Sequence, residues 1–178
     1  MPKLERLEWV APLADGRGVT LTDDPAADQF LAEDPNALLL GVLYDSQYQT
    51  RRAFAIPFKL RERLGHLDLQ RMASEGEEPL LTAFLTRPAL HRFPGKFARQ
   101  TYQLVQVLVA DYGGDASRIW REVANLDDLG RRLMALPCFG TEKTNWTIGM
   151  LGRLGLISFP GWEEYRVKAA AKKKPSSA

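Results

Sequence analysis

The chain has 178 residues, of which 45% are hydrophobic and 26% are charged, and its formal net charge is +2. These values are typical of one or two small globular domains that bury a sizeable core. No run of about eighteen apolar residues is present, so we expect no membrane span. The opening sequence does not resemble a secretory signal, and we therefore expect a cytoplasmic protein.

The chain contains a single cysteine, Cys138. One thiol cannot form an internal disulfide, and it cannot by itself ligate an iron–sulfur cluster or a zinc knuckle. The two histidines, His66 and His91, have no metal partners visible in the sequence. We therefore expect no metal ion and no cofactor.

Charge is distributed unevenly along the chain. The first fifty residues hold nine acids and three bases, whereas the rest holds thirteen acids and twenty-one bases. A basic body of this kind fits a polyanionic partner, although surface charge also serves solubility alone. The segment Lys168–Ala178 is Lys-rich and has little to bury, so we expect a disordered tail. Such a tail either adds salt-sensitive affinity for DNA or keeps the protein soluble.

No alternating strand pattern is long enough to trust, and the sequence predicts an all-α fold. Asp68, Asp115 and Asn125 are expected helix caps, and Gly65 an expected helix stop. In chain order we expect an irregular arm over 1–24, helices over 26–32, 36–49 and 50–64, and short helices over 68–74 and 79–85. A turn-rich loop over 90–96 and a long helix over 96–112 should follow, and then helices over 117–123, 126–136 and 145–154. The long helix is amphipathic, with Tyr102, Val105, Val109 and Tyr112 on one face.

The stretch Leu136–Thr144 is the most informative part of the chain, because it joins two amphipathic helical runs through a short Pro/Gly turn. Gly140 permits a tight turn and close approach of the backbone. Thr141 is the expected cap of the second helix. The N–H groups at the start of that helix point outward at its positive end. This arrangement is typical of proteins that grip a DNA backbone without reading its bases.

Three further segments occur in an order that is similar to a known family. Leu38–Gln47 is a helical segment that ends in a Gln, Phe93–Lys96 is a loop before a long helix, and Pro160–Trp162 follows the hairpin turn Leu136–Gly140. Over roughly 36–165 the chain resembles the helix-hairpin-helix-GPD glycosylases of base-excision DNA repair. In detail it resembles a little-characterised bacterial branch that lacks an iron–sulfur cluster.

The resemblance implies a helix-hairpin-helix glycosylase-like fold of two small helical subdomains with a cleft between them. It implies an arm and first helix over 1–35 that pack on the second subdomain, a core over 36–165 with its hairpin at 126–155, and the tail over 166–178. A monomer that acts on damaged double-stranded DNA at the nucleoid is the expected biological unit.

The resemblance also implies roles for individual residues, with Gln47 entering the DNA at the lesion. The implied DNA-binding residues are Gln47, Arg51, Arg92, Lys96, Cys138, Phe139, Gly140, Thr141 and Lys143; the implied base pocket is Tyr44, Tyr48, Trp146 and Trp162; and the candidate catalytic residues are Lys143, Glu163 and Glu164.

The chain departs from the family pattern at the positions of the catalytic Asp, the catalytic Lys and the first hairpin Gly. The family places an Asp after the hairpin, but the corresponding stretch 155–162 has none, and the nearest acids are Glu163 and Glu164. The family Lys position holds Glu142, and Lys143 comes one residue later. Two roles therefore stay open for Lys143, a Schiff base with an abasic sugar or a contact with phosphate. Cys138 replaces the first hairpin Gly, at a cost if that position needs a positive φ.

Three functions remain as alternatives. The first is a DNA glycosylase that flips a damaged base and cleaves its N-glycosidic bond, with abasic-site lyase activity as an addition. The second is a non-catalytic protein that binds lesions or DNA structures on the same fold. The third is a helical protein-interaction module whose hairpin packs internally.

Overall fold

The computed structural model describes residues 21–165, and the expected tail and most of the expected arm lie outside this range. Every regular element within 21–165 is helical, which confirms the all-α prediction. The helices are α2 Pro25–Glu33, α3 Pro35–Tyr44, α4 Thr50–Leu64, α5 Leu69–Glu75, α6 Glu78–Leu85, α7 Pro94–Tyr112, α8 Arg118–Arg121, α9 Leu126–Met134 and α10 Thr141–Arg153. None of the helices described is long and apolar enough to cross a membrane.

Short polar side chains set where several helices begin. Asp34 accepts hydrogen bonds from the backbone N–H groups of Asn36 and Ala37 at the start of α3. Asp68 and Asn125 accept from N–H groups in the first turns of α5 and α9, which confirms both as caps. Gly65 ends α4 at a φ of 78°, a left-handed conformation that Gly adopts without steric cost.

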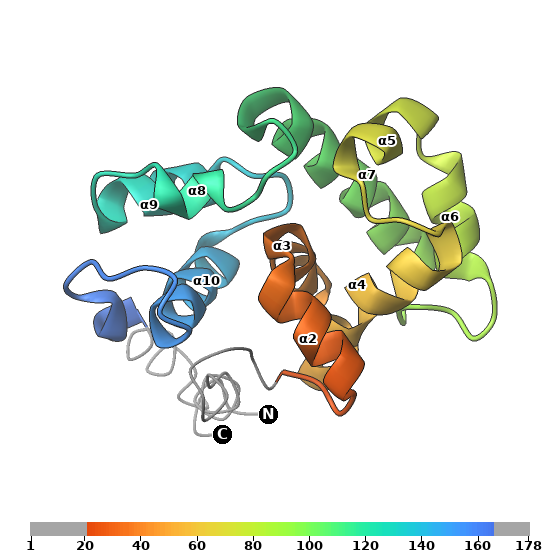
Figure 1. Ribbon diagram of the computed structural model, residues 1–178, viewed down its shortest axis with the longest axis horizontal. Helices are drawn as coiled ribbons and strands as arrows, with labels where there is room; N and C mark the ends of the chain where they lie inside the picture. Colours follow the sequence, from red (N-terminus) through yellow and green to blue (C-terminus); the bar gives the residue numbers. More distant parts are fainter. Residues whose placement is uncertain (1–20, 166–178) are drawn as a thin grey trace, which may run out of the picture.

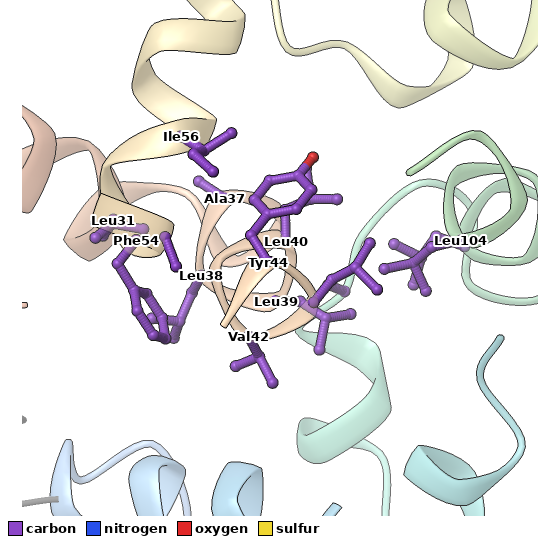
Figure 2. Packing of buried hydrophobic residues seen from close by; sticks show 14 of the residues in the cluster. Leu31, Ala37, Leu38, Leu39, Leu40, Val42, Tyr44, Phe54, Ile56 and Leu104 are labelled. Atoms are coloured by element: carbon purple, nitrogen blue, oxygen red, sulfur yellow. The ribbon is translucent and has the colours of Figure 1, made fainter. Parts of the chain in front are cut away.

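The central element is α3, which is buried on every side. All residues from Ala37 to Tyr44 are buried, and a helix that is apolar all round belongs in a core. Figure 1 shows α3 between a group formed by α5, α6 and α7 and a group formed by α8, α9 and α10. Figure 2 shows its side chains pointing outward in several directions, with Phe54 on one side and Leu104 on the other. Because α3 contacts α2, α4, α7 and α10, it fixes the relative positions of both groups.

A close approach between α3 and α4 depends on Gly41. A Cβ at that position would come within 2.4 Å of Cδ1 of Phe54, so no larger residue fits without a shift. The Phe54 ring in turn stacks on Trp146 of α10, with ring centroids 5.7 Å apart. Aromatic stacking therefore links α4 to the second hairpin helix.

The long helix α7 packs the predicted face against the core, but its most buried residues extend beyond that face. Its buried residues are Phe97, Ala98, Thr101, Leu104, Val105 and Leu108, whereas Tyr102, Val109 and Tyr112 are partly buried and pack against the core. Thr101 is polar, yet its hydroxyl is satisfied inside the core by the Phe97 carbonyl and the Tyr44 hydroxyl.

The predicted helix over 36–49 was wrong at its end, because α3 stops at Tyr44. The Tyr44 carbonyl accepts hydrogen bonds from the N–H of Ser46, at 2.8 Å, and from the imidazole of His91, at 3.0 Å. These partners replace the helical N–H that would continue α3. Residues 45–49 therefore form a turn, and Gln47 at its tip has a φ of 52°.

The hairpin helices also differ from the predicted ranges. α9 ends at Met134, before the predicted end at Leu136, and α10 begins at Thr141, the residue that was expected to cap it. Gly140 is the N-cap of α10, so Thr141 is its first helical residue and not its cap. No side chain caps this helix, which leaves its first turn open toward solvent and toward the turn after α3.

Candidate functional site

A cavity of about 530 Å³ lies between the end of α3 and the start of α10. One wall is the end of α3 and the turn after it, and the other is the hairpin loop and the first turns of α10. The residues that line the cavity are Val42, Asp45, Ser46 and Gln47 from the first wall, and Cys138, Gly140, Thr141, Glu142, Lys143 and Trp146 from the hairpin.

The ammonium-bearing side chain of Lys143 is half-buried in this cavity. Its Nζ donates a hydrogen bond to the main-chain carbonyl of Cys138, at 3.3 Å. Burial lowers the pKa of Lys143, and the positive charge of Lys96 acts in the same direction, whereas Cys138 and Asp45 raise it. A lowered pKa increases the fraction of neutral amine, which is the nucleophilic form.

The hairpin turn needs a left-handed residue, and that residue is Cys138. Its φ is 65°, in the region that costs a non-Gly residue roughly 1–2 kcal/mol. This conformation turns the Cys138 carbonyl toward the amine of Lys143. The Cys138 thiol is exposed, and its only hydrogen-bond contact among the described residues is a long one, 3.9 Å from Oε1 of Gln103.

The start of α10 presents main-chain donors to the same cavity. The first intrahelical bond of α10 runs from the Thr144 N–H to the Gly140 carbonyl. N–H groups in the first turn of an α-helix have no carbonyl in a preceding turn, and the dipole gives this end a positive potential. Gly140, Thr141 and Glu142 are all exposed. This surface suits a phosphate oxygen or another anion.

Gln47 projects from the turn opposite the hairpin. It is exposed, lines the cavity and has a positive φ, which is uncommon for a residue with a side chain. The turn is held from both ends. Thr50 donates its hydroxyl to Oδ1 of Asp45 at 3.1 Å, and the Tyr44 carbonyl is fixed by His91. A strained residue held by its surroundings is a candidate for function.

His91 is a buried residue and not a surface residue of the loop. Its side chain donates from Nε2 to the Tyr44 carbonyl, and its Nδ1 accepts from the N–H of Phe93 at 3.1 Å. The ring also lies against Phe97, with centroids 3.8 Å apart. Burial lowers the pKa of His91 and favours the neutral ring that these two hydrogen bonds require. His91 thus joins the loop before α7 to the end of α3.

Of the four aromatic residues expected to form a base pocket, one lines the cavity. Trp146 does so, although most of its side chain is buried against Phe54. Tyr44 is fully buried, and its hydroxyl lies 2.8 Å from the hydroxyl of Thr101, so it belongs to the core. Tyr48 is half-buried and packs on His91, with centroids 4.4 Å apart.

Trp162 lies against the back of α10 and does not line the cavity. A Cβ on Gly152 would come within 2.1 Å of its ring. The ring therefore packs on the helix that carries Lys143, at a position where that helix has no side chain. Phe139, expected to contact DNA, is buried as well and anchors the hairpin in the core.

The other expected basic residues lie outside the lining of the cavity. Lys96, in the first turn of α7, is exposed and close enough for its charge to act on Lys143. Arg92 is exposed, with its guanidinium carbon 5.3 Å from the centre of the Phe93 ring. Arg51 forms an ion pair with Asp23. None of these three side chains lines the cavity.

The two candidate catalytic acids lie outside the cavity. Glu163 and Glu164 are exposed residues after the turn at Gly161, on the segment that carries Trp162. The acids that do line it are Asp45 and Glu142, neither of which was predicted as catalytic. The signal for Asp45 was present in the sequence, because an Asp-Ser pair favours a turn. It was missed because the helical pattern was extended across it.

No group of three or more His, Cys, Asp or Glu side chains that could hold a metal ion occurs within residues 21–165. Comparisons of the chain with protein-family models, with curated proteins and with solved structures find no match.

Proposed function

We propose that the protein is a base-excision DNA repair enzyme, a DNA glycosylase with abasic-site lyase activity, that acts as a monomer on damaged duplex DNA in the cytoplasm. The observation that carries this proposal is the half-buried amine of Lys143 inside a cavity of about 530 Å³. That volume is within the range of pockets that enclose a small ligand, and a flipped nucleotide is a ligand of this size.

The amine supplies the chemistry. Neutral Nζ of Lys143 attacks C1′ of the deoxyribose, and the bond between C1′ and the base breaks. The base leaves with the electron pair and takes up a proton. On an abasic sugar the same amine adds to the aldehyde and forms a Schiff base after loss of water. Loss of a proton from C2′ then expels the 3′ phosphate.

The surroundings of the cavity fit a DNA backbone. The uncapped start of α10 offers main-chain N–H groups to a phosphate. Two exposed cations lie at the start of α7, Arg92 just before it and Lys96 in its first turn, and the charge of Lys96 acts on Lys143. Gln47 at the tip of the opposite turn has an amide that both donates and accepts, so it can pair with the base left behind when its partner is flipped.

A second candidate function is a non-catalytic protein that binds lesions. The observation that favours it is the position of Glu163 and Glu164 outside the cavity, which removes the acids expected to assist base release. In that case Lys143 contacts a phosphate or an abasic sugar without forming a covalent bond.

Base release from a panel of duplexes, each with one damaged base, tests the proposal. We expect release from at least one lesion, together with tighter binding to lesion duplexes than to intact DNA. Preferential binding without release would favour the lesion-binding protein. A chain that fails to bind any duplex at low salt would contradict both functions, because phosphate contacts are strongest there.

A further inference from the structure

We propose that Asp45 is the proton-transfer residue that acts with Lys143. Its carboxylate and the amine line the same cavity from opposite walls, one from the turn after α3 and the other from the start of α10. This inference rests on the proposed function, because it names the group that moves protons at the carbon that Lys143 attacks.

Asp45 places a carboxylate at a helix end that disfavours negative charge. It is the C-cap of α3, and its N–H bonds to the carbonyls of Gly41 and Val42. A carboxylate at this end of a helix faces the negative pole of the dipole, where a cation is favoured. The structure instead fixes the carboxylate there, since Oδ1 accepts a hydrogen bond from the buried Thr50 at 3.1 Å.

Charges from four segments act at Lys143 or lie beside it. Asp45 faces it from the turn after α3, Cys138 from the hairpin loop and Lys96 from α7, while Glu142 precedes it on α10. Asp45 is the carboxylate whose charge favours the protonated amine. Glu142 is exposed in the first turn of α10, whereas Asp45 is partly buried. A partly buried carboxylate that lines the same cavity as an amine can exchange protons with it through one water.

The step takes one proton from solvent and needs no other reactant. Nζ of Lys143 forms a bond to C1′ of the open-chain abasic sugar, and the carbonyl π pair moves to its oxygen, which takes that proton from solvent. The nitrogen then gives a proton to the Asp45 carboxylate, directly or through one water. The resulting carboxylic acid returns that proton to the C1′ hydroxyl, which leaves as water while the nitrogen lone pair forms the C=N bond, and a protonated Schiff base remains.

The experiment is the rate of borohydride trapping on a duplex with one abasic site, measured against pH. For the wild type we expect a rise to a plateau as the amine deprotonates. Asp45→Asn should lower the plateau at least tenfold, since general acid–base groups contribute about 10²–10⁴-fold. Its midpoint should move to lower pH, because the neutral amide no longer stabilises the ammonium. Asp45→Glu should recover part of the plateau.

Three comparisons separate proton transfer from a structural role. Thr50→Val breaks the hydrogen bond that holds the carboxylate but keeps the acid, so its plateau should exceed that of Asp45→Asn. Asp127→Asn removes an exposed carboxylate in α9 and should match the wild type. Glu163→Gln should also match it.

The outcomes distinguish the two proposals. If Asp45→Asn reaches the same plateau trapping rate as the wild type, the role of Asp45 alone is overturned. Equal reductions of the plateau rate in Asp45→Asn and Thr50→Val, or a reduced plateau rate in Glu163→Gln, would overturn it as well. A wild-type protein that binds abasic duplex but is not trapped at any pH would contradict the lyase function, and this inference with it.

Discussion

The imidazole of His91 donates from Nε2 to the main-chain carbonyl of Tyr44, at 3.0 Å, across 47 residues of sequence. This hydrogen bond ends α3 one residue before Asp45. It also attaches the loop before α7 to the turn that presents Gln47, because Nδ1 of the same ring accepts from Phe93. The geometry of one wall of the cavity therefore depends on a neutral histidine.

The first prediction concerns pH and His91. Burial lowers the pKa of His91 in the folded protein, so the unfolded chain binds more protons once the pH falls below about 6.5. The stability that the neutral ring contributes is therefore present above that pH and is lost as the pH falls below it. Between pH 8 and pH 5, the free energy of unfolding measured in urea should fall more steeply with decreasing pH for the wild type than for His91→Asn. Parallel curves would show that protonation of His91 is not coupled to folding.

A second prediction concerns the packing of Trp162 on α10. In Gly152→Ala the added Cβ would lie 2.1 Å from the ring, so the indole must move. We expect a loss of about 1–3 kcal/mol in the free energy of unfolding, the usual cost of an overpacked site.

The matched control is Gly130→Ala in α9, where nothing lies within 4 Å of the added Cβ. That change should leave stability unchanged or raise it by about 0.5–1 kcal/mol, since Ala favours the helix. Denaturant unfolding measures both variants. Equal effects of the two substitutions would mean that Trp162 does not pack on Gly152 in solution.

A third prediction concerns the left-handed residue of the hairpin. Cys138 has a φ of 65°, and Gly adopts this conformation without steric cost. Cys138→Gly should raise the free energy of unfolding by about 0.5–1 kcal/mol. This is the backbone strain that Gly relieves in the folded state, reduced by the greater conformational entropy of Gly in the unfolded chain. Cys138→Ala keeps the strain and should not stabilise the protein. If Ala stabilises as much as Gly, the thiol and not the backbone is the source of the cost.

A fourth prediction concerns Gln47. Because Gln47 lines the cavity from an exposed turn, Gln47→Ala should weaken the preference for a lesion duplex more than it weakens binding to intact duplex. Arg92→Ala should reduce affinity for both duplexes alike, as expected for a phosphate contact. Titration of labelled duplexes at fixed salt measures the ratio of lesion-duplex affinity to intact-duplex affinity for each variant. Equal losses on the two duplexes in Gln47→Ala would refute its role at the lesion.

The sequence predicted those features that depend on neighbouring residues. Helix caps at Asp68 and Asn125 and the stop at Gly65 follow from local hydrogen bonds and from backbone conformation, and the structure confirms them. The all-α class follows from helical periodicity over similarly short stretches. The turn at Leu136–Gly140 was also visible, because Pro and Gly interrupt an amphipathic pattern there.

The features that the sequence missed depend on residues far apart in the chain. α3 ends at Tyr44 because His91 occupies its carbonyl, and no pattern near residue 44 reveals that partner. Tyr44 reads as an available aromatic residue, but Thr101 of α7 satisfies its hydroxyl inside the core. Asp45 becomes a candidate for chemistry only once α3 and α10 are packed together, since Lys143 lies 98 positions later in the chain.

The most direct test of the central proposal is borohydride trapping of the protein on a duplex that contains one abasic site. We expect the wild type to form a stable covalent adduct and Lys143→Ala to form none, while Lys59→Ala, which removes an exposed Lys from α4, should form as much adduct as the wild type. Adduct formation by Lys143→Ala at the wild-type level, or none by the wild type, would contradict the assignment of Lys143 as the nucleophile.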